Sequence, residues 1–362
     1  MRRIAGIVLA VLLIGGVVAA VVAGREAADA EDKGTATKTV RAVIGSEKAA
    51  FFADPDVVKA LAAKGWTVRA ETSGSWAMEQ LDLEGYDLAF PSSQAPADEL
   101  ADKYGVRKPL PRPFYSPLVV VAHRSAAQVL AANGLVTLDR SRGGTLRMGP
   151  FLDAARADRT WQQLKGAGKH GELIGTVYVA TTDPESSNSG ALYLAAASYV
   201  ANGNRVVAGT AELDRVTPLM RKLVQAQGAQ KSSSDATFRD FVSGVGDPLV
   251  LVYESQVAAL LREGGTSVGD LTVLYPDTTA TSDHTVVPLT DEGRALGDLL
   301  AADPQLRQLA VRHGFRPQGA SAEFTEATDA HTAYLNQQLT GVRQAPVPTS
   351  EVLREMARRA RG

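Results

Sequence analysis

The stretch Thr176–Tyr199, TVYVATTDPESSNSGALYLAAASY, decides the fold class because its pattern changes twice. It begins with an apolar, partly β-branched run at Val177–Val179, breaks at Asp183-Pro184, and passes through Glu185–Gly190 into an alanine- and leucine-rich run. This order predicts a strand, a hydroxyl-rich loop and the start of a helix. Helix N-termini present unpaired N–H groups, so the loop suits an anion or a polar small molecule. Ser and Asn are also ordinary N-caps, so a purely structural role is the alternative.

Strand-like and helix-like segments alternate along the rest of the chain. The predicted strands are Val40–Ile44, Trp66–Ala70, Tyr86–Phe90, Pro117–Ala122, Leu249–Tyr253, Leu271–Tyr275 and Thr285–Pro288. The predicted helices are Ala49–Lys64 (broken at Pro55), Ala126–Ala132, Gln256–Arg262, Leu289–Ala302 and Pro304–His313. Strands that alternate with helices predict open, mostly parallel α/β sheets.

Composition excludes several classes of function. The chain has 362 residues, enough for two domains, and a formal net charge of −2, so nothing indicates nucleic-acid binding. Because it contains no cysteine, disulfide frameworks, thiol catalysis and cysteine zinc sites are excluded. No nucleophile-elbow, phosphate-loop or dinucleotide motif occurs, and no two histidines have i, i+4 spacing. The sequence therefore predicts neither an enzyme nor a metal or cofactor site.

The N-terminus predicts export from the cytoplasm. Arg2-Arg3 precede an apolar run over residues 4–24, which is long enough to cross a bilayer. Residues 1–30 are either an uncleaved signal anchor or a signal peptide removed at Ala28-Asp29-Ala30. Residues 31–38 are a polar linker. The remainder is expected outside the cytoplasm, tethered to the membrane in the first case and secreted in the second.

Small hydroxyl and glycine residues follow the predicted strands. They are Gly45-Ser46, Ser73-Gly74-Ser75, Ser92-Ser93, the Ser186–Gly190 loop and Tyr253-Glu254-Ser255. In open α/β sheets, ligands bind at the carboxyl ends of the strands. Serine hydroxyls and glycine backbone N–H groups replace a hydration shell, although Ser and Gly are also common turn residues. Several such loops at one sheet edge predict a binding site.

The order and spacing of these motifs resemble the type II periplasmic (extracellular) solute-binding proteins, nearest the molybdate/sulfate-binding branch of ABC transporter substrate-binding proteins. The resemblance covers roughly Thr39–Gly341. It rests on Tyr86–Ser93 (YDLAFPSS), Phe114–Val121 (FYSPLVVV), Asp183–Gly190 (DPESSNSG), Val252–Gln256 (VYESQ) and His313–Pro317 (HGFRP).

The resemblance implies a two-lobed α/β fold, with open mixed sheets, helices on both faces and ligand held in the cleft between the lobes. Lobe I would comprise residues 39–120 and 277–341, lobe II residues 121–276, and residues 342–362 a C-terminal tail. Pro117–Ala122 and Leu271–Tyr275 would be the two crossover strands. The ligand-binding residues implied by position are Ser46, Ser75, Ser92, Ser93, Ser187, Asn188, Ser189 and Tyr253, with Glu254 beside them.

Two departures from the family pattern affect the ligand. Sulfate-type members carry a Ser-Gly-Gly-Ala-Arg run where this chain has Ser187–Ala191, so the arginine is absent. A carboxylate at Glu254 would repel a bare oxyanion, so this side chain either points to solvent or accepts hydrogen bonds from the ligand. His284, in a polar stretch beside Asp283, is expected to be a solvated loop residue. Trp76 is expected to be a packing residue, with the alternative that it lines the cleft because it follows Ser75.

Two functions follow from the resemblance. The first is a monomeric, membrane-tethered binding protein that captures a small polar ligand, possibly an oxyanion, and presents it to a membrane partner such as an ABC importer. The second is a non-transport sensing or interaction module of the cell envelope, of the type joined to a von Willebrand A domain. Residues 351–361 form either a short basic helix or, as the default expectation, a solvated frayed tail.

Overall fold

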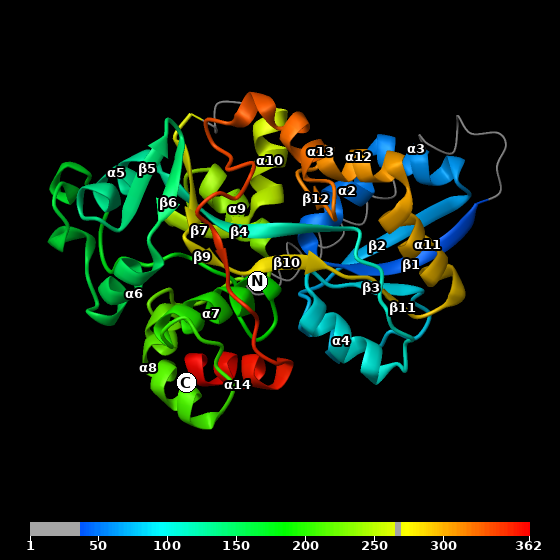
Figure 1. The fold of residues 1–362 in the computed structure, drawn as a ribbon, viewed down its shortest axis with the longest axis horizontal. Coiled ribbons are helices and arrows are strands. Elements are labelled where there is room, and N and C mark those ends of the chain that lie inside the picture. The colour runs from blue at the N-terminus through cyan, green and yellow to red at the C-terminus, as the bar shows by residue number, and fades with distance from the viewer. Residues whose placement is uncertain (1–36, 265–268) are drawn as a thin grey trace, which may run out of the picture.

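The computed structural model describes residues 37–264 and 269–362, which form two α/β lobes connected through one long strand, β4 (Phe114–His123). In Figure 1, β4 runs across the middle of the molecule, with one sheet at each end. β4 is almost entirely buried and carries the run FYSPLVVVAH. Because both faces of this strand are covered by protein, its segment Leu118–Ala122 is continuously apolar rather than alternating.

Lobe I contains a four-stranded sheet in the order β11-β3-β1-β2, in which only β11 runs antiparallel to its neighbour. Its strands are β1 (Lys38–Ile44), β2 (Trp66–Thr72), β3 (Leu88–Phe90) and β11 (Val287–Pro288). Its helices are η1 (Ser46–Lys48), α2 (Ala49–Ala53), α3 (Pro55–Ala63), η2 (Ala77–Gln80), α4 (Gln94–Lys103), α11 (Asp291–Ala302) and α12 (Pro304–Arg312). Asp54 caps α3 directly before Pro55, which separates α2 from α3 as the sequence predicts.

Lobe II contains a mixed sheet in the order β10-β4-β8-β6-β5, with β7 and β12 also paired to β4. Its other strands are β5 (Val136–Arg140), β6 (Gly143–Leu146), β7 (Leu249–Tyr253), β8 (Leu271–Pro276), β10 (Thr281–His284) and β12 (Arg316–Pro317); β9 (Thr278–Thr279) pairs with β13 (Arg343–Gln344). Its helices are α5 (Arg124–Ala132), α6 (Met148–Arg156), η3 (Trp161–Gln163), η4 (Ala167–Lys169), α7 (Asn188–Ala201), α8 (Thr210–Gln225), α9 (Ser234–Val242), α10 (Glu254–Glu263) and α14 (Ser350–Arg361).

The return crossing between the lobes differs from the expectation. Leu271–Tyr275 was expected to be a crossover strand, but β8 pairs with the lobe II end of β4 and with β6. The chain returns to lobe I through β10, which pairs antiparallel with β4 from Pro117 to Phe114. β4 and β10 together therefore form the connection, because an antiparallel pair satisfies the backbone hydrogen bonds of both strands where they leave the sheets.

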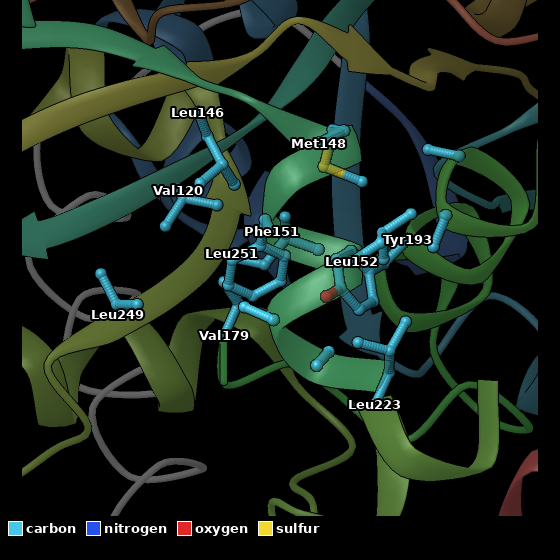
Figure 2. Close-up of a cluster of buried hydrophobic side chains, with 14 of the residues drawn as sticks. Val120, Leu146, Met148, Phe151, Leu152, Val179, Tyr193, Leu223, Leu249 and Leu251 are labelled. Atoms are coloured by element: carbon cyan, nitrogen blue, oxygen red, sulfur yellow. The ribbon is translucent and has the colours of Figure 1, made fainter. Parts of the chain in front are cut away.

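The core of lobe II lies between its sheet and the helices α6, α7 and α8. Figure 2 shows Phe151 and Leu152 of α6 close to Leu251 of β7 and Tyr193 of α7. Val179, which precedes α7 in the chain, lies beside them. From Asn188 to Ser198, every residue of α7 is buried. A helix that is apolar on all sides is typical of an element surrounded by protein.

The fold-deciding stretch forms its helix as predicted but not its strand. Val177–Val179 does not belong to a regular strand. The residues on either side of it form isolated bridges: Thr176 pairs with Thr160, and Ala180 pairs with Val250 of β7. The Ala180 N–H donates to the Leu249 carbonyl, and the Leu251 N–H donates to the Ala180 carbonyl. The prediction of a full strand was wrong because only this one residue meets the edge of β7.

The expected frayed tail is instead a docked helix. Within α14, Val352, Leu353, Met356, Ala357 and Ala360 are buried against α7 and α8. These positions form one apolar stripe, and the arginines lie on the other face. Figure 1 shows α14 beside α8 and α7 below the sheets.

The end of the expected first lobe also packs differently. The helix α13 (Ser321–Ala327) contributes Phe324, and the following turns, including η6 (Asp329–His331), lead to Leu335. Both side chains are buried against Val252 and Val273 of the lobe II sheet. This segment therefore contacts both lobes: Phe324 and Leu335 pack on lobe II, while Glu323 pairs with Arg307 of α12 in lobe I.

None of the helices in the described part of the chain combines the length and apolar character needed to span a membrane. The predicted signal anchor, residues 1–30 with its apolar run over 4–24, lies outside the described residues, as does most of the linker 31–38.

Candidate functional site

Five of the expected site residues lie together where the two lobes meet. The Ser92 backbone N–H donates to Ser75 Oγ over 2.9 Å. The Ser93 hydroxyl donates to Asn188 Oδ1 over 2.5 Å and so crosses from lobe I to lobe II. Asn188 Nδ2 in turn donates to the Tyr253 hydroxyl oxygen over 3.1 Å. All five side chains are buried, and we call this group the interlobe polar cluster.

The remaining expected serines lie next to the cluster, with other partners. Ser46 Oγ accepts a 3.0 Å hydrogen bond from Ser233 Oγ, at the N-terminus of α9, which is a second link between the lobes. Ser189 Oγ lies 2.7 Å from Thr182 Oγ1 and 3.5 Å from Ser187 Oγ. Ser187 and Ser189 are therefore held within lobe II, while Ser46 faces across the interface.

A buried ion pair, Glu47–Lys48, adjoins the cluster. The Lys48 side chain is 0% exposed and the Glu47 side chain 4%. The Lys48 ammonium donates to Glu47, to Ser92 Oγ over 3.3 Å and to His284 Nδ1 over 3.0 Å. Glu47 Oε1 also accepts from Ser92 Oγ over 2.6 Å. The pair lies on η1, directly after β1, so its two side chains share one short turn at the lobe interface.

Burial determines the charge state of the surrounding groups. Desolvation lowers the pKa of His284 well below its ordinary value, and the nearby Lys48 charge lowers it further. Desolvation also lowers the pKa of Lys48, which Glu47 opposes by favouring the charged form. Since neutral His284 accepts from Lys48 at Nδ1, its proton lies on Nε2, 3.5 Å from Ser282 Oγ. Burial first, and then Glu47, raise the pKa of Tyr253, so its hydroxyl keeps its proton.

His284 was expected to be a solvated loop residue, and this prediction was wrong. Its side chain is fully buried in β10, among Phe90, Phe114 and Phe315. Only the neighbouring Asp283 keeps partly exposed partners, Arg112 and Gln318. The alternation of strand residues therefore points His284 inward and Asp283 outward.

Two helix N-termini meet at the cluster. Ser93 is the N-cap of α4 and Ser187 the N-cap of α7, and neither side chain caps its own helix. Ser93 instead donates to the first residue of α7, Asn188. The first N–H groups of a helix carry a partial positive charge, and here two such ends lie on opposite sides of one interface. This arrangement favours oxygen acceptors and negative charge.

The lobes also touch through backbone atoms. The N–H groups of Trp76 and Ala77 donate to the Ser186 carbonyl, each over 3.2 Å. A Cβ atom at Gly74 would lie 2.3 Å from the same carbonyl, so only glycine permits this approach. Trp76 packs against Ala191 and Leu353, as expected of a packing residue, although the packing is between lobes.

Glu254 was expected either to point to solvent or to accept hydrogen bonds from a ligand, and in the structure it is instead paired with Arg316. It is fully buried and accepts from Arg316 Nε over 2.5 Å and Nη2 over 2.8 Å. The Tyr275 hydroxyl also donates to it. Because these donors satisfy the carboxylate, Glu254 is a structural ion-pair partner beside the lobe connection and faces neither solvent nor a ligand.

The sequence-based search missed Glu47, Lys48, Ser282 and His284. It selected small residues after strands, and charged residues at such positions are usually solvated. A usable signal was the position of Glu47 and Lys48, the third and fourth residues after the end of β1. His284 carries no local signal, because its contact with Lys48 joins residues 236 positions apart.

The interface contains groups of the kind that bind polar molecules. It offers buried hydroxyls, an amide, one cation, one anion and two helix N-termini. Such groups can replace the hydration shell of a polar molecule. Within residues 37–264 and 269–362, no group of three or more His, Cys, Asp or Glu side chains is placed to hold a metal ion.

Comparisons with known proteins agree with this geometry. The model of the bacterial extracellular solute-binding protein family matches residues 63–316. A comparison with curated protein sequences gives no match.

Several solved structures share the fold. A periplasmic thiamin binding protein is 14% identical, with a TM-score of 0.58, over 91% of this chain and 99% of that chain. The fructose-6-phosphate-bound periplasmic binding protein AfuA from Actinobacillus pleuropneumoniae is 11% identical, with a TM-score of 0.57, over 90% and 97%. Iron-bound HitA from Pseudomonas aeruginosa is 12% identical, with a TM-score of 0.56, over 89% and 99%.

At these identities the solved structures show the fold alone, a two-lobed α/β periplasmic-binding-protein fold. The family match covers more than half of the chain and includes all five residues of the interlobe polar cluster. The chain therefore belongs to the bacterial extracellular solute-binding protein family.

Proposed function

We propose that this protein captures a small polar ligand between its lobes and presents it, outside the cytoplasm, to a membrane partner such as an ABC importer. One observation carries the proposal: the buried hydrogen bond from Ser93 to Asn188 joins two helix N-termini across the lobe interface. Buried donors that meet between two separately folded lobes are what a ligand held in a cleft requires.

The chemistry of the interface defines the class of ligand. Both helix N-termini and the Ser75 and Ser92 hydroxyls favour oxygen acceptors, and Lys48 adds a positive charge. A carboxylate, a phosphate or another oxyanion has such acceptors. The oxyanions of the molybdate/sulfate branch are therefore candidates, although this chain uses a lysine and lacks the arginine of the sulfate-type run.

Hinged closure would couple binding to presentation. The lobes are joined by the paired strands β4 and β10, and contact each other through the Ser186 carbonyl and the Ser46–Ser233 hydrogen bond. A ligand that contacts both lobes stabilises the arrangement in which they touch, and thereby shifts the population toward it. A monomer tethered through residues 4–24 would hold this form near its membrane partner.

A thermal-shift screen with a paired variant tests the proposal. The probes are phosphate, sulfate, molybdate, hexose phosphates, amino acids and thiamin. A ligand at a hundredfold excess over its dissociation constant stabilises the fold by about 2.7 kcal/mol. We expect one class to raise Tm, and Ser93→Ala with Asn188→Ala to remove the rise. The exposed Ser321→Ala is the control. A rise that survives the double variant would place the ligand elsewhere.

The second candidate, a sensing or interaction module, is favoured by one specific observation. The helix α14 packs on lobe II, yet its Arg354 pairs with Glu79 and lies 3.7 Å from Glu99, both in lobe I. A C-terminal helix in contact with both lobes would report their relative position to a partner. If so, a ligand found in the screen should slow hydrogen exchange in α14. Unchanged exchange there would favour the transport role alone.

A further inference from the structure

We propose that the ligand of the interlobe site carries both a positive and a negative group, and that it exchanges with the internal Glu47–Lys48 ion pair. Lys48 would then bind the negative group and Glu47 the positive one. The inference rests on the proposed function and names its class of ligand: a small zwitterion with no net charge.

The first argument is the position of the ion pair. Glu47 and Lys48 lie on η1, whose Ser46 hydroxyl accepts a hydrogen bond from Ser233 of lobe II. Lys48 also donates to Ser92, the residue before Ser93, which makes the hydrogen bond across the lobes. The pair is therefore continuous with the interlobe polar cluster, and we propose that separation of the lobes exposes it.

The second argument is charge balance. A bare anion bound by Lys48 would leave the Glu47 carboxylate, now 4% exposed, without its cation. A bare cation bound by Glu47 would strand the Lys48 ammonium in the same way. An unpaired buried charge is strongly disfavoured. A zwitterion avoids both penalties, because each protein charge exchanges one partner for another.

The third argument is the direction in which each charge would lie. The two helix N-termini at Ser93 and Asn188 favour the negative group on the Lys48 side.

The pair is also built to be exchanged. Its members are neighbours in sequence on a three-residue turn, and the ammonium has three polar partners: Glu47, Ser92 and His284. Lysine is a flexible point charge, so it can move from an internal carboxylate to one on a ligand without reorganising the backbone.

Isothermal titration with matched probes tests the inference on the intact chain. One set is β-alanine with its halves, propionate and ethylamine. The other is γ-aminobutyrate with butyrate and butylamine. We expect at least one zwitterion to bind at least tenfold more tightly than either of its halves. Binding should be lost in the Ser93→Ala, Asn188→Ala double variant.

Charge variants make the prediction specific. Glu47→Gln should raise the affinity for the anionic half at least tenfold and weaken the zwitterion. The exposed Glu84→Gln is the matched control and should change neither. Should Glu47→Gln not fold, the double variant Glu47→Gln, Lys48→Met removes both charges together and should lose all preference between zwitterion and halves.

The outcomes separate the two proposals. Phosphate binding that requires Ser93 and Asn188 but is unaffected by Glu47→Gln would overturn the zwitterion inference and leave the proposed function intact. Equal affinity for a zwitterion and its anionic half would also overturn it. If none of the probes, charged or zwitterionic, binds in this assay or in the thermal-shift screen, both proposals fail.

Discussion

The described residues include two buried carboxylate–cation pairs, Glu254–Arg316 and Glu47–Lys48, with very different surroundings. Arg316 binds Glu254 through two nitrogens and donates to the carbonyls of Asn336 and Gln337, while its guanidinium lies 4.0 Å from the Phe324 ring centroid. Each of the three guanidinium nitrogens therefore donates at least one hydrogen bond. Hydrogen bonding to Glu254 raises the pKa of Arg316 although burial alone would lower it.

The pair at the lobe interface is held less firmly. Lys48 contributes a single ammonium, and burial lowers its pKa in spite of Glu47. Its polar partners, Ser92 and His284, have short or rigid side chains that also serve other contacts. The comparison teaches that burial alone does not define the role of an ion pair. A pair satisfied from all sides fixes a fold, whereas one at an interface between lobes can exchange partners.

The largest effect is expected at the fixed pair. Arg316→Met should lower the free energy of unfolding by about 3–5 kcal/mol, because it leaves the Glu254 carboxylate buried without a cation. Urea denaturation measures the loss. Arg307→Met, in the partly exposed pair with Glu323, is the control and should cost about 0–1 kcal/mol. A loss of under 1 kcal/mol for Arg316→Met would show that the Glu254–Arg316 pair does not fix the fold, and would contradict its contrast with the Glu47–Lys48 pair.

A smaller effect is expected at the interface. Lys48→Met should cost about 1–3 kcal/mol in the same assay, since Glu47 keeps its hydrogen bond from Ser92 and gains water when the lobes part. The order of the two variants is the sharper prediction. If Lys48→Met destabilised the protein as much as Arg316→Met, the interface pair would be structural, and the proposed exchange with a ligand would lose its basis.

The pH dependence of stability should come partly from the interface. The pKa of His284 in the folded chain lies well below its ordinary value near 6.5, because of burial and the facing Lys48 charge. The unfolded chain therefore binds the extra proton first. Stability from this group is complete above about pH 6.5 and falls as the pH drops below it, by at most about 1.4 kcal/mol per pH unit.

Replacement of the histidine checks this assignment. His284→Asn should flatten the dependence of unfolding free energy on pH between about 6.5 and 5. The half-buried His331→Gln should keep it. If His284→Asn retained the full slope, the loss of stability would arise elsewhere, for example at His313, whose pKa is also lowered by burial.

The smallest effect on stability, but a clear one on geometry, is expected at Gly74. A Cβ there meets the Ser186 carbonyl, so Gly74→Ala should separate the lobes without disturbing either core. Because the chain has no cysteine, spin labels can be placed at Val58→Cys and Ile174→Cys, exposed positions on the two lobes. Distance distributions from electron paramagnetic resonance should change, while the urea midpoint stays within the error of the parent. Identical distances would show that the contact at Ser186 does not hold the lobes together.

Much of the fold could be predicted from local patterns. Pro55 after Asp54 separates two helices, Gly314 ends a helix with a positive φ of 79°, and Ser187 precedes α7 as expected. These features depend on the chemistry of one or two residues and their neighbours. The strand expected at Val177–Val179 failed because its pairing depends on how closely β7 approaches, which no local pattern records.

Only the uncharged residues of the candidate site, the serines and Asn188, could be predicted from the sequence. Ser93 and Asn188 follow from the rule that loops after strands converge at one sheet edge. Glu254 could not be resolved, because its partner Arg316 lies 62 residues away in the chain. The docking of α14 was detectable, since Val352, Met356 and Ala360 recur at helical spacing, but the basic residues between them favoured a solvated tail.

A crystal structure of the protein with its tightest-binding zwitterion is the most direct test of the account. We expect the ligand between Ser93, Asn188 and Lys48, with the Glu47–Lys48 contact replaced by contacts to the ligand and the Glu254–Arg316 pair unchanged. A ligand bound at another place, or one bound beside an intact Glu47–Lys48 pair, would contradict the account.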